Sequence, residues 1–413
     1  MRQSRRPARV HRFTYAIRNI VAEAQKVEAA GTRVRYLNIG DPVAFGFKTP
    51  AHLVAAVERA MRDGHNNYWT VGRHSGGARS GGRRVHGERV SGRRPDRVFI
   101  TAGTSEGIEL TLERRRRQRR RSARADADLP ALHAPCSRSS TPKRSYYRLD
   151  STHGWMPDLD HLKSLVTPAT RALVVIDPNN PTGAVYPTET RRALLDFADR
   201  HGLPDPRRRG LRRSRFRRPR STPYGLLDPD APIISFSSLS KAYLAPGWRT
   251  GWMACGRSPR LDDVVAAVQK LADGRLCSTV PMQYAIAPAL TGDRSHQLVV
   301  PRGAEGARRS HGRAPVRDAR RQLRRADRGV LRDAATIALP PGRTDEDYVK
   351  ALLHATGVLC VYGSGFGLPA EEGFLRIVFL APLDELSEIY DLMAAFTAQY
   401  SAEISDFGVQ ISD

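Results

Sequence analysis

Five consecutive apolar residues, Ala172 to Ile176, constrain the fold of this chain more than any other segment. The side chains of a strand alternate between the two faces of a sheet, so a strand without polar residues is covered on both faces. Such strands occur in sheets that carry helices on each side and are mostly parallel. The run therefore predicts a buried strand of an α/β fold.

Helices and strands alternate along the rest of the chain, which is the order that an α/β fold requires. Amphipathic spacing predicts helices over 13–30, 50–61, 189–200, 261–272 and 383–400, with a helical start at 108–112. Apolar runs predict further strands over 34–39, 97–101, 232–238 and 251–255. The length of 413 residues is enough for two or three domains with sizeable cores.

Arginine is concentrated in a few segments of the chain. There are 67 basic and 42 acidic residues, which gives a net charge of +25, and 60 of the basic residues are arginine. Of these arginines, 39 lie in four windows, 73–97, 114–148, 207–220 and 302–332, and the rest of the chain is slightly acidic. Segments such as Arg114 to Arg121 show neither helical nor strand periodicity, so the windows differ in kind from the remainder of the sequence.

Three interpretations of these arginine-rich windows compete. Clustered arginines can form a nucleic-acid surface, but segments such as Arg114 to Arg121 lack the interleaved aromatic residues that single-strand binding needs. Blocks of like charge can also be disordered insertions, because they repel one another and resist burial. In the third interpretation the windows are translated out of frame from a GC-rich gene, whose other frames are rich in arginine codons.

Composition also excludes several classes of protein. No apolar run approaches the 18 or so residues of a membrane span. The basic start, Met1 to Arg6, is not followed by an apolar segment, so we expect no secretory signal and a cytoplasmic protein. The four cysteines, Cys136, Cys255, Cys277 and Cys360, have no CxxC spacing, so we expect neither a zinc site nor a dithiol, and no metal.

The segment after the strand over 232–238 carries the clearest chemistry. Ser238 and Ser240 precede Lys241, and Arg249 follows between glycines. A lysine amine can form a covalent bond with an aldehyde cofactor, and a guanidinium can bind an anionic group through two hydrogen bonds. The amides of a strand-to-helix turn at Gly103 and Thr104 would complete a phosphate site. The alternative, an ordinary surface lysine, is disfavoured because the chain has only seven lysines.

These residues resemble the pyridoxal-phosphate lysine motif of the class I/II aminotransferases of fold type I. Asp177 to Gly183 resembles the NPTG turn of that family, and Phe374 to Val378 resembles its C-terminal arginine strand. Tyr36 to Pro42, followed by Phe45 to Phe47, is similar to the substrate loop of the alanine aminotransferase-like branch. The motifs stand in family order at family-like distances, and four in order are a specific signal.

The resemblance implies a fold type I architecture. It consists of a three-layer αβα large domain with a mostly parallel sheet and a smaller α/β domain. Residues 1–50 would form an N-terminal arm and part of the small domain, 51–295 the large cofactor-binding domain, and 296–413 the C-terminal small domain. The activity implied is transfer of an amino group between an L-amino acid and a 2-oxo acid by a ping-pong mechanism. It would need pyridoxal 5′-phosphate and a homodimer.

The resemblance also assigns roles to individual residues. Lys241 would bond to the cofactor and then move the α-proton of the substrate. The other cofactor-binding residues would be Gly103, Thr104, Asn180, Ser238, Ser240, Arg249 and, from the neighbouring subunit, Tyr68. The substrate would be bound by Gly40, Asn180 and Arg376. The Asn180–Pro181 peptide bond is often cis in the family.

The sequence departs from the family at the floor of the cofactor site. The family carries an Asp-Glu-apolar-Tyr segment roughly 28 residues after the asparagine of its NPTG turn, and here that place reads Pro204 to Arg209. The aspartate of that segment pairs with the ring nitrogen of the cofactor. The aromatic residue that stacks on the ring cannot be placed within 114–148. Because intact motifs resume in family order beyond each window, we favour translation out of frame, and activity of the chain as written is in doubt.

Two other functions remain open at this stage. A carbon–sulfur lyase of the same fold would share Lys241 and Arg249. An inactive aminotransferase domain could serve as a basic nucleic-acid-binding protein, although no helix-turn-helix module precedes residue 13. The amino acid used is also open, because no second arginine motif for a substrate side chain is evident.

Overall fold

A computed structural model describes residues 16–68, 95–113, 121–125, 144–203, 205–208, 223–297, 332–378 and 380–405. For the strands over 121–125, 205–208 and 332–336 it describes the backbone only. Most of each arginine-rich window lies outside these residues, so the three interpretations of the windows stay predictions.

The large lobe is built on a five-stranded sheet with the order β2 (Val98–Thr101), β11 (Gly251–Cys255), β10 (Ile233–Ser238), β9 (Asp205–Arg208) and β8 (Val175–Ile176). Strand β11 runs antiparallel to both of its neighbours. The pairs β10–β9 and β9–β8 are parallel, so four of the strands share one direction. The expected, mostly parallel sheet is therefore confirmed.

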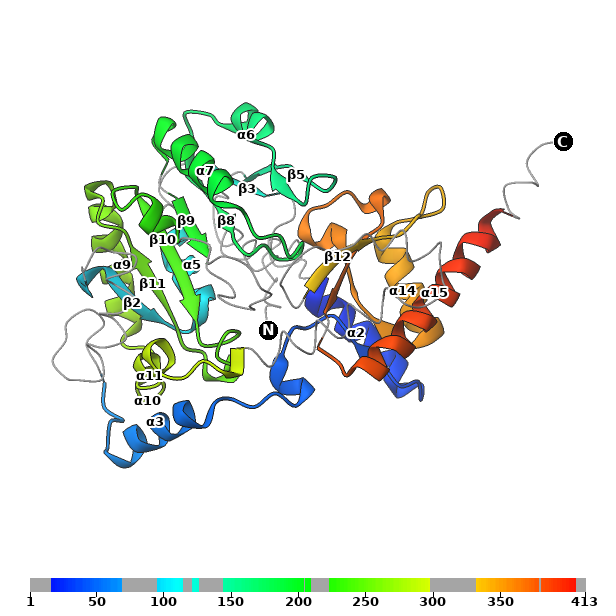
Figure 1. Cartoon of the computed structure of the whole chain (residues 1–413), viewed down its shortest axis with the longest axis horizontal. Helices are drawn as coiled ribbons and strands as arrows, with labels where there is room; N and C mark the ends of the chain where they lie inside the picture. Colours follow the sequence, from blue (N-terminus) through cyan, green and yellow to red (C-terminus); the bar gives the residue numbers. More distant parts are fainter. Residues whose placement is uncertain are drawn as a thin grey trace, which may run out of the picture.

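Helices cover both faces of this sheet (Figure 1). On β11, Met253 and Cys255 pack in one apolar cluster with residues of α9 (Asp262–Arg275) and α5 (Gly103–Glu113). The intervening Trp252 packs in a different cluster, with residues of α3 (Ala51–Arg62). Alternate side chains of one strand thus enter separate cores, which is the arrangement of a three-layer domain.

The apolar run 172–176 is split into two short strands where one strand was expected. Strand β7 (Thr170–Leu173) pairs with β3 (Arg121–Ala125), whereas β8 pairs with β9 of the central sheet. The five side chains of the run are nevertheless all buried, and the four from Leu173 to Ile176 enter two different cores. The prediction of burial on both faces is confirmed, and the prediction of one continuous strand is wrong.

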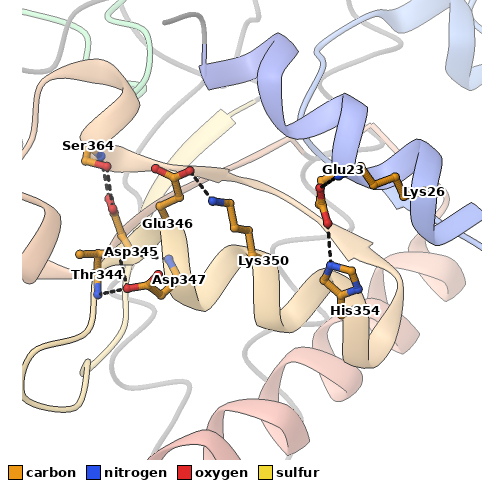
Figure 2. A network of polar contacts seen from close by, with 9 residues as sticks. All are labelled: Glu23, Lys26, Thr344, Asp345, Glu346, Asp347, Lys350, His354 and Ser364. Carbon is orange, nitrogen blue, oxygen red and sulfur yellow. Dashed lines mark hydrogen bonds and ion pairs between the residues drawn. The ribbon is translucent and has the colours of Figure 1, made fainter.

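The second lobe contains elements from both ends of the chain (Figure 1). Helix α2 (Ala16–Ala29) packs in one apolar cluster with α14 (Asp345–Thr356) and α15 (Leu383–Ser405). His354 on α14 also contacts Glu23 on α2 (Figure 2), with its Nε2 2.9 Å from a carboxylate oxygen. The exact boundaries expected between the domains stay predictions.

The remaining elements complete the two lobes. The other helices are α6 (Leu159–Leu165), α7 (Thr188–Arg200), α8 (Tyr224–Leu227), α10 (Val280–Gln283) and α11 (Ile286–Thr291). The other strands are β1 (Arg35–Tyr36), β4 (Arg144–Tyr147), β5 (Leu149–Asp150), β6 (Met156–Pro157), β12 (Arg332–Thr336), β13 (Val358–Leu359), β14 (Val361–Tyr362) and β15 (Phe374–Val378). Short 3-10 helices are η1 (Pro42–Phe45), η2 (Pro95–Arg97), η6 (Pro246–Trp248), η7 (Pro259–Leu261), η8 (Gly363–Phe366) and η9 (Ala370–Glu372).

Within the described ranges no helix is long and apolar enough to cross a bilayer. The same residues contain no group of three or more His, Cys, Asp or Glu side chains that could hold a metal ion. Burial raises the pKa of the Cys255 and Cys360 thiols to about 12, so both are packing residues without thiolate chemistry.

Candidate active site

Lys241 lies in the turn that follows the central strand β10. The hydroxyl of Ser238, at the end of that strand, accepts a hydrogen bond from the Ser240 amide at 3.3 Å. The Lys241 side chain is half-buried, and its Nζ donates to the carbonyl oxygen of Gly40. The structure thus brings the expected catalytic lysine against the expected substrate loop, which is far away in the sequence.

A potential anion site lies at the N-terminus of α5. The guanidinium of Arg249 packs directly on Gly103, because a Cβ built on Gly103 would lie 2.6 Å from Arg249 Nη2. Gly251 also approaches this turn closely, since its Cβ would lie 2.8 Å from the carbonyl carbon of Gly103. The first amides of an α-helix and a guanidinium both attract negative charge. The expected phosphate-binding residues Gly103, Thr104 and Arg249 therefore adjoin one another.

The NPTG turn follows β8 and is held by its own side chains. Asn179 Oδ1 accepts from the Thr182 amide at 3.2 Å and from the Thr182 hydroxyl at 2.8 Å. The Asn180–Pro181 peptide bond is cis, as the resemblance implied. Asn180 is buried, and its Oδ1 has no hydrogen-bond partner among the described residues. Buried polar atoms are normally satisfied, so this oxygen is suited to a polar group of a ligand.

A buried ion pair beneath this turn was not expected from the sequence. Arg191 Nε on α7 lies 2.7 Å from Asp177 Oδ2, and both side chains are almost fully buried. The Tyr224 hydroxyl donates to the same carboxylate at 3.1 Å, and the Arg191 guanidinium lies 5.3 Å from the Tyr224 ring centre. Burial raises the pKa of the Asp177 carboxyl, and Arg191 opposes that rise. These contacts fix the point where β8 turns toward Asn180.

Arg376 lies on β15, as expected, and is only 2% exposed. Its Nη2 donates to the carbonyl oxygen of Asn38, and its guanidinium carbon lies 4.9 Å from the ring centre of Phe366. Lys241 contacts Gly40, two residues further along the same segment. The base and the carboxylate-binding arginine expected from the sequence therefore converge on residues 38–40.

Asn38 is a second feature that the sequence did not assign. Its side chain is completely buried, and neither amide atom has a hydrogen-bond partner among the described residues. Its backbone carbonyl already contacts Arg376. The motif around Tyr36 to Pro42 located this residue without giving it a role, because a single asparagine in a loop has no local signature of function.

An apolar cluster joins three of the segments that form the site: the lysine turn, β15 and the substrate loop. Leu244, just after Lys241, is buried with Val378 of β15 and Leu380, and Phe45 and Phe47 of the substrate loop pack against them. The Thr49 hydroxyl donates to the Leu244 carbonyl at 2.6 Å and ties the loop to the lysine turn. None of the residues in this cluster carries a charge.

Tyr68 is an expected site residue for which the structure shows no contact with the others. It follows α3 and is 80% exposed. The resemblance places it in the site of a neighbouring subunit, so its role stays a prediction.

Strand β9 occupies the place where the sequence departs from the family. Its backbone lies between β8 and β10, and Arg208 is paired with Ile176 on one side and Phe236 on the other. The flanking strands lead to Asn180 and to Lys241. The window with the missing carboxylate therefore does supply a central strand that ends beside the site. The stacking aromatic residue expected within 114–148 stays unplaced.

The residues of this site suit most of the functional groups of pyridoxal phosphate. The turn at Gly103, Thr104 and Arg249 suits the phosphate, and the unpartnered oxygen of Asn180 suits a polar ring substituent. Lys241 suits the aldehyde. In β9 the sequence reads Asp205 to Arg208, and it has arginine where the resemblance implies the carboxylate that pairs with the ring nitrogen.

Comparison with known proteins agrees with this geometry. The sequence matches the family "aminotransferase class I and II" over residues 37–389, which includes the motifs named above except for Tyr36 at the start of the substrate loop. The chain belongs to this family. Its members of this fold use pyridoxal 5′-phosphate, and the expected enzyme class, a pyridoxal-phosphate-dependent aminotransferase, is thereby confirmed.

Similar proteins cover nearly the whole chain. The alanine aminotransferase of Mycobacterium tuberculosis is 31% identical over 95% of this chain and 92% of its own length. The glutamate-pyruvate aminotransferase AlaA of Escherichia coli is 29% identical over 95% of this chain and 98% of its own length. Among solved structures, the alanine aminotransferase from Pyrococcus furiosus has a TM-score of 0.84 and 29% identity, covering 96% of this chain and 100% of its own.

More distant structures share the fold. The aspartate aminotransferase from Thermus thermophilus has a TM-score of 0.76 at 20% identity. The fold type I architecture implied by the sequence is confirmed. No finding favours a carbon–sulfur lyase or a nucleic-acid-binding protein.

Proposed function

We propose that this aminotransferase moves the amino group between alanine and 2-oxoglutarate, forming pyruvate and glutamate. The observation that carries the proposal is the convergence of Lys241 and Arg376 on residues 38–40. An amino acid whose carboxylate is bound by Arg376 would present its α-carbon to the neighbouring lysine. The relatives named for alanine and for glutamate and pyruvate support the substrate pair.

The surroundings of Gly40 support a small apolar substrate side chain. Phe45, Phe47, Leu244 and Val378 form the uncharged cluster beside the loop. A second carboxylate on the substrate would need a cation to offset the cost of leaving water, and this cluster offers none. The longer 2-oxoglutarate must then place its second carboxylate against another part of the site.

In this proposal each residue has a defined task. Arg376 and the Gly40 backbone bind the substrate carboxylate, and Lys241 holds the cofactor and moves the α-proton. Asn180 contacts the ring of the cofactor and the substrate. Gly103, Thr104, Ser238, Ser240 and Arg249 bind the phosphate. The cofactor, when bound, supplies the electron sink that makes the α-proton removable.

Alanine-dependent formation of glutamate is the first test. Purified chain supplied with pyridoxal phosphate is expected to convert alanine and 2-oxoglutarate to pyruvate and glutamate, and a variant restored at the end of β9 should do so faster. Arg376→Met should raise the KM for alanine strongly, because the α-carboxylate loses a bidentate partner. Pyruvate released from a thioether amino acid without any 2-oxo acid would instead favour the lyase.

We also propose a cytoplasmic homodimer in which Tyr68 reaches the phosphate bound by the neighbouring subunit. Its 80% exposure leaves the ring available to a partner. Sedimentation of the full chain should give twice the mass of 45.8 kDa. Tyr68→Phe should weaken cofactor binding without changing that mass, because only the hydroxyl is removed. A monomer with full cofactor affinity would contradict the proposal.

A further inference from the structure

We propose that Asp345, through Ser364 and Phe366, positions Arg376 for the substrate carboxylate. The inference rests on the proposed function of Arg376 and adds residues that lie outside the cofactor-binding motifs. Asp345 touches neither cofactor nor substrate in this scheme. It is a positioning residue that acts through the short helix η8.

Asp345 makes an unusual contact for the first turn of a helix. Its side chain is completely buried, Oδ2 accepts from the Ser364 amide at 2.6 Å, and Oδ1 accepts from the Ser364 hydroxyl at 2.7 Å. Figure 2 shows the carboxylate directed at Ser364 and away from the exposed Glu346–Lys350 pair on the same helix. Both oxygens of this buried carboxylate thus accept hydrogen bonds from Ser364, and the backbone amides of Gly363 and Glu346 also bond to the carboxylate.

Asp345 is not needed to begin α14. Thr344 and Asp347 form a complete capping box, in which Thr344 Oγ1 accepts from the Asp347 amide at 3.1 Å and Asp347 Oδ2 accepts from the Thr344 amide at 3.0 Å. Such a box already satisfies the first amides of a helix. Burying a further carboxylate costs free energy unless hydrogen bonds compensate for the lost water. Here they fix the position of η8.

Helix η8 carries the ring on which Arg376 rests. Its last residue, Phe366, is completely buried, and its ring centre lies 4.9 Å from the guanidinium carbon of Arg376. Its first residue, Gly363, lies so close to β15 that a Cβ would come within 2.5 Å of Phe374 Cβ. The helix therefore packs tightly on the arginine strand, and a shift at Ser364 is transmitted to the ring beneath Arg376.

A ring face under a guanidinium attracts it and also limits its tilt. Two-point binding of a carboxylate needs the plane of the guanidinium to be fixed, because both hydrogen bonds form in that plane. The contacts from Asp345 to Arg376 thus prepare the arginine for a planar ligand before the ligand arrives.

The test measures carboxylate binding separately from stability. The probe is propionate, titrated into the full chain and followed by ligand-observed NMR, and binding lost in Arg376→Met defines the arginine-dependent part. Phe366→Met is expected to weaken that part about tenfold, because the ring face is lost while a large apolar side chain is kept. Asp345→Asn and Ser364→Ala should weaken it severalfold, and pyridoxal phosphate affinity should stay unchanged in all three variants.

Asp347→Asn is the matched control. It weakens the start of the same helix without touching Ser364, so its melting temperature should fall while its affinity for propionate is kept. Wild-type affinity in Phe366→Met, Asp345→Asn and Ser364→Ala would overturn the inference and leave the proposed function standing. If the unsubstituted chain shows no Arg376-dependent binding, the proposed carboxylate clamp fails, and the positioning role fails with it.

Discussion

Lys241→Ala is expected to abolish covalent attachment of pyridoxal phosphate and to lower the transamination rate at least about a thousandfold. The structure gives the physical reason. The Lys241 amine lies in the turn after the central strand β10, in contact with the carbonyl of Gly40, and Arg376 contacts the same loop. No other lysine of the described residues has a hydrogen bond to this loop in the structure. Reduction of the loaded protein with borohydride followed by peptide mass spectrometry would place the attachment at Lys241.

Lys270→Ala serves as the control for this experiment. Lys270 is exposed on α9, and the substitution removes the same functional group without approaching the site. Its cofactor attachment and rate should match those of the unsubstituted chain. Attachment that persists in Lys241→Ala, with the reduced cofactor on another lysine, would refute the assignment.

The spacing of apolar residues predicted the secondary structure well for strands and helices that are buried along their whole length. The strand expected over 251–255 is β11 to the residue, and the helix expected over 189–200 is α7 with one further residue at its start. Both signals come from periodicity, which reflects the faces that a strand or helix buries. The motifs also located Lys241 and Arg376 on segments that both contact residues 38–40, and Asn180 after a strand of the sheet whose strand β10 leads to Lys241.

The residues that hold the site in place could not be predicted in the same way. Arg191 lies on a helix whose pattern gives no sign that an arginine is buried, and its partner Asp177 belongs to another element. Asp345 pairs with Ser364 across a turn, and α14 itself was not expected. Such pairs depend on tertiary contacts between distant segments, so neither residue type nor spacing reveals them.

The second large effect is expected from a substitution in β9, where the sequence departs from the family. Arg208→Asp is expected to tighten pyridoxal phosphate binding and to raise the rate of the half-reaction with alanine by roughly a thousandfold or more. The strand register supports the choice of Arg208, which is the last residue of β9. This strand is paired with β8, which leads to Asn180, and with β10, which leads to Lys241. A carboxylate at that end would hold a proton on the ring nitrogen of the bound cofactor, and a guanidinium opposes it.

The size of the effect follows from charge. Two unit charges about 4 Å apart interact by roughly 4 kcal/mol at an effective dielectric constant of about 20. Exchanging repulsion for attraction removes this energy as a penalty and also adds it as a stabilisation. Arg212→Asp is the control, since it changes the net charge equally within the same window. Both variants would be compared with the unsubstituted chain by cofactor titration and by single-turnover kinetics with alanine. Equal rates in all three proteins would show that β9 does not form the floor of the cofactor site. A rate that rises only in Arg208→Asp would show that one carboxylate at the end of this strand is what the chain as written lacks.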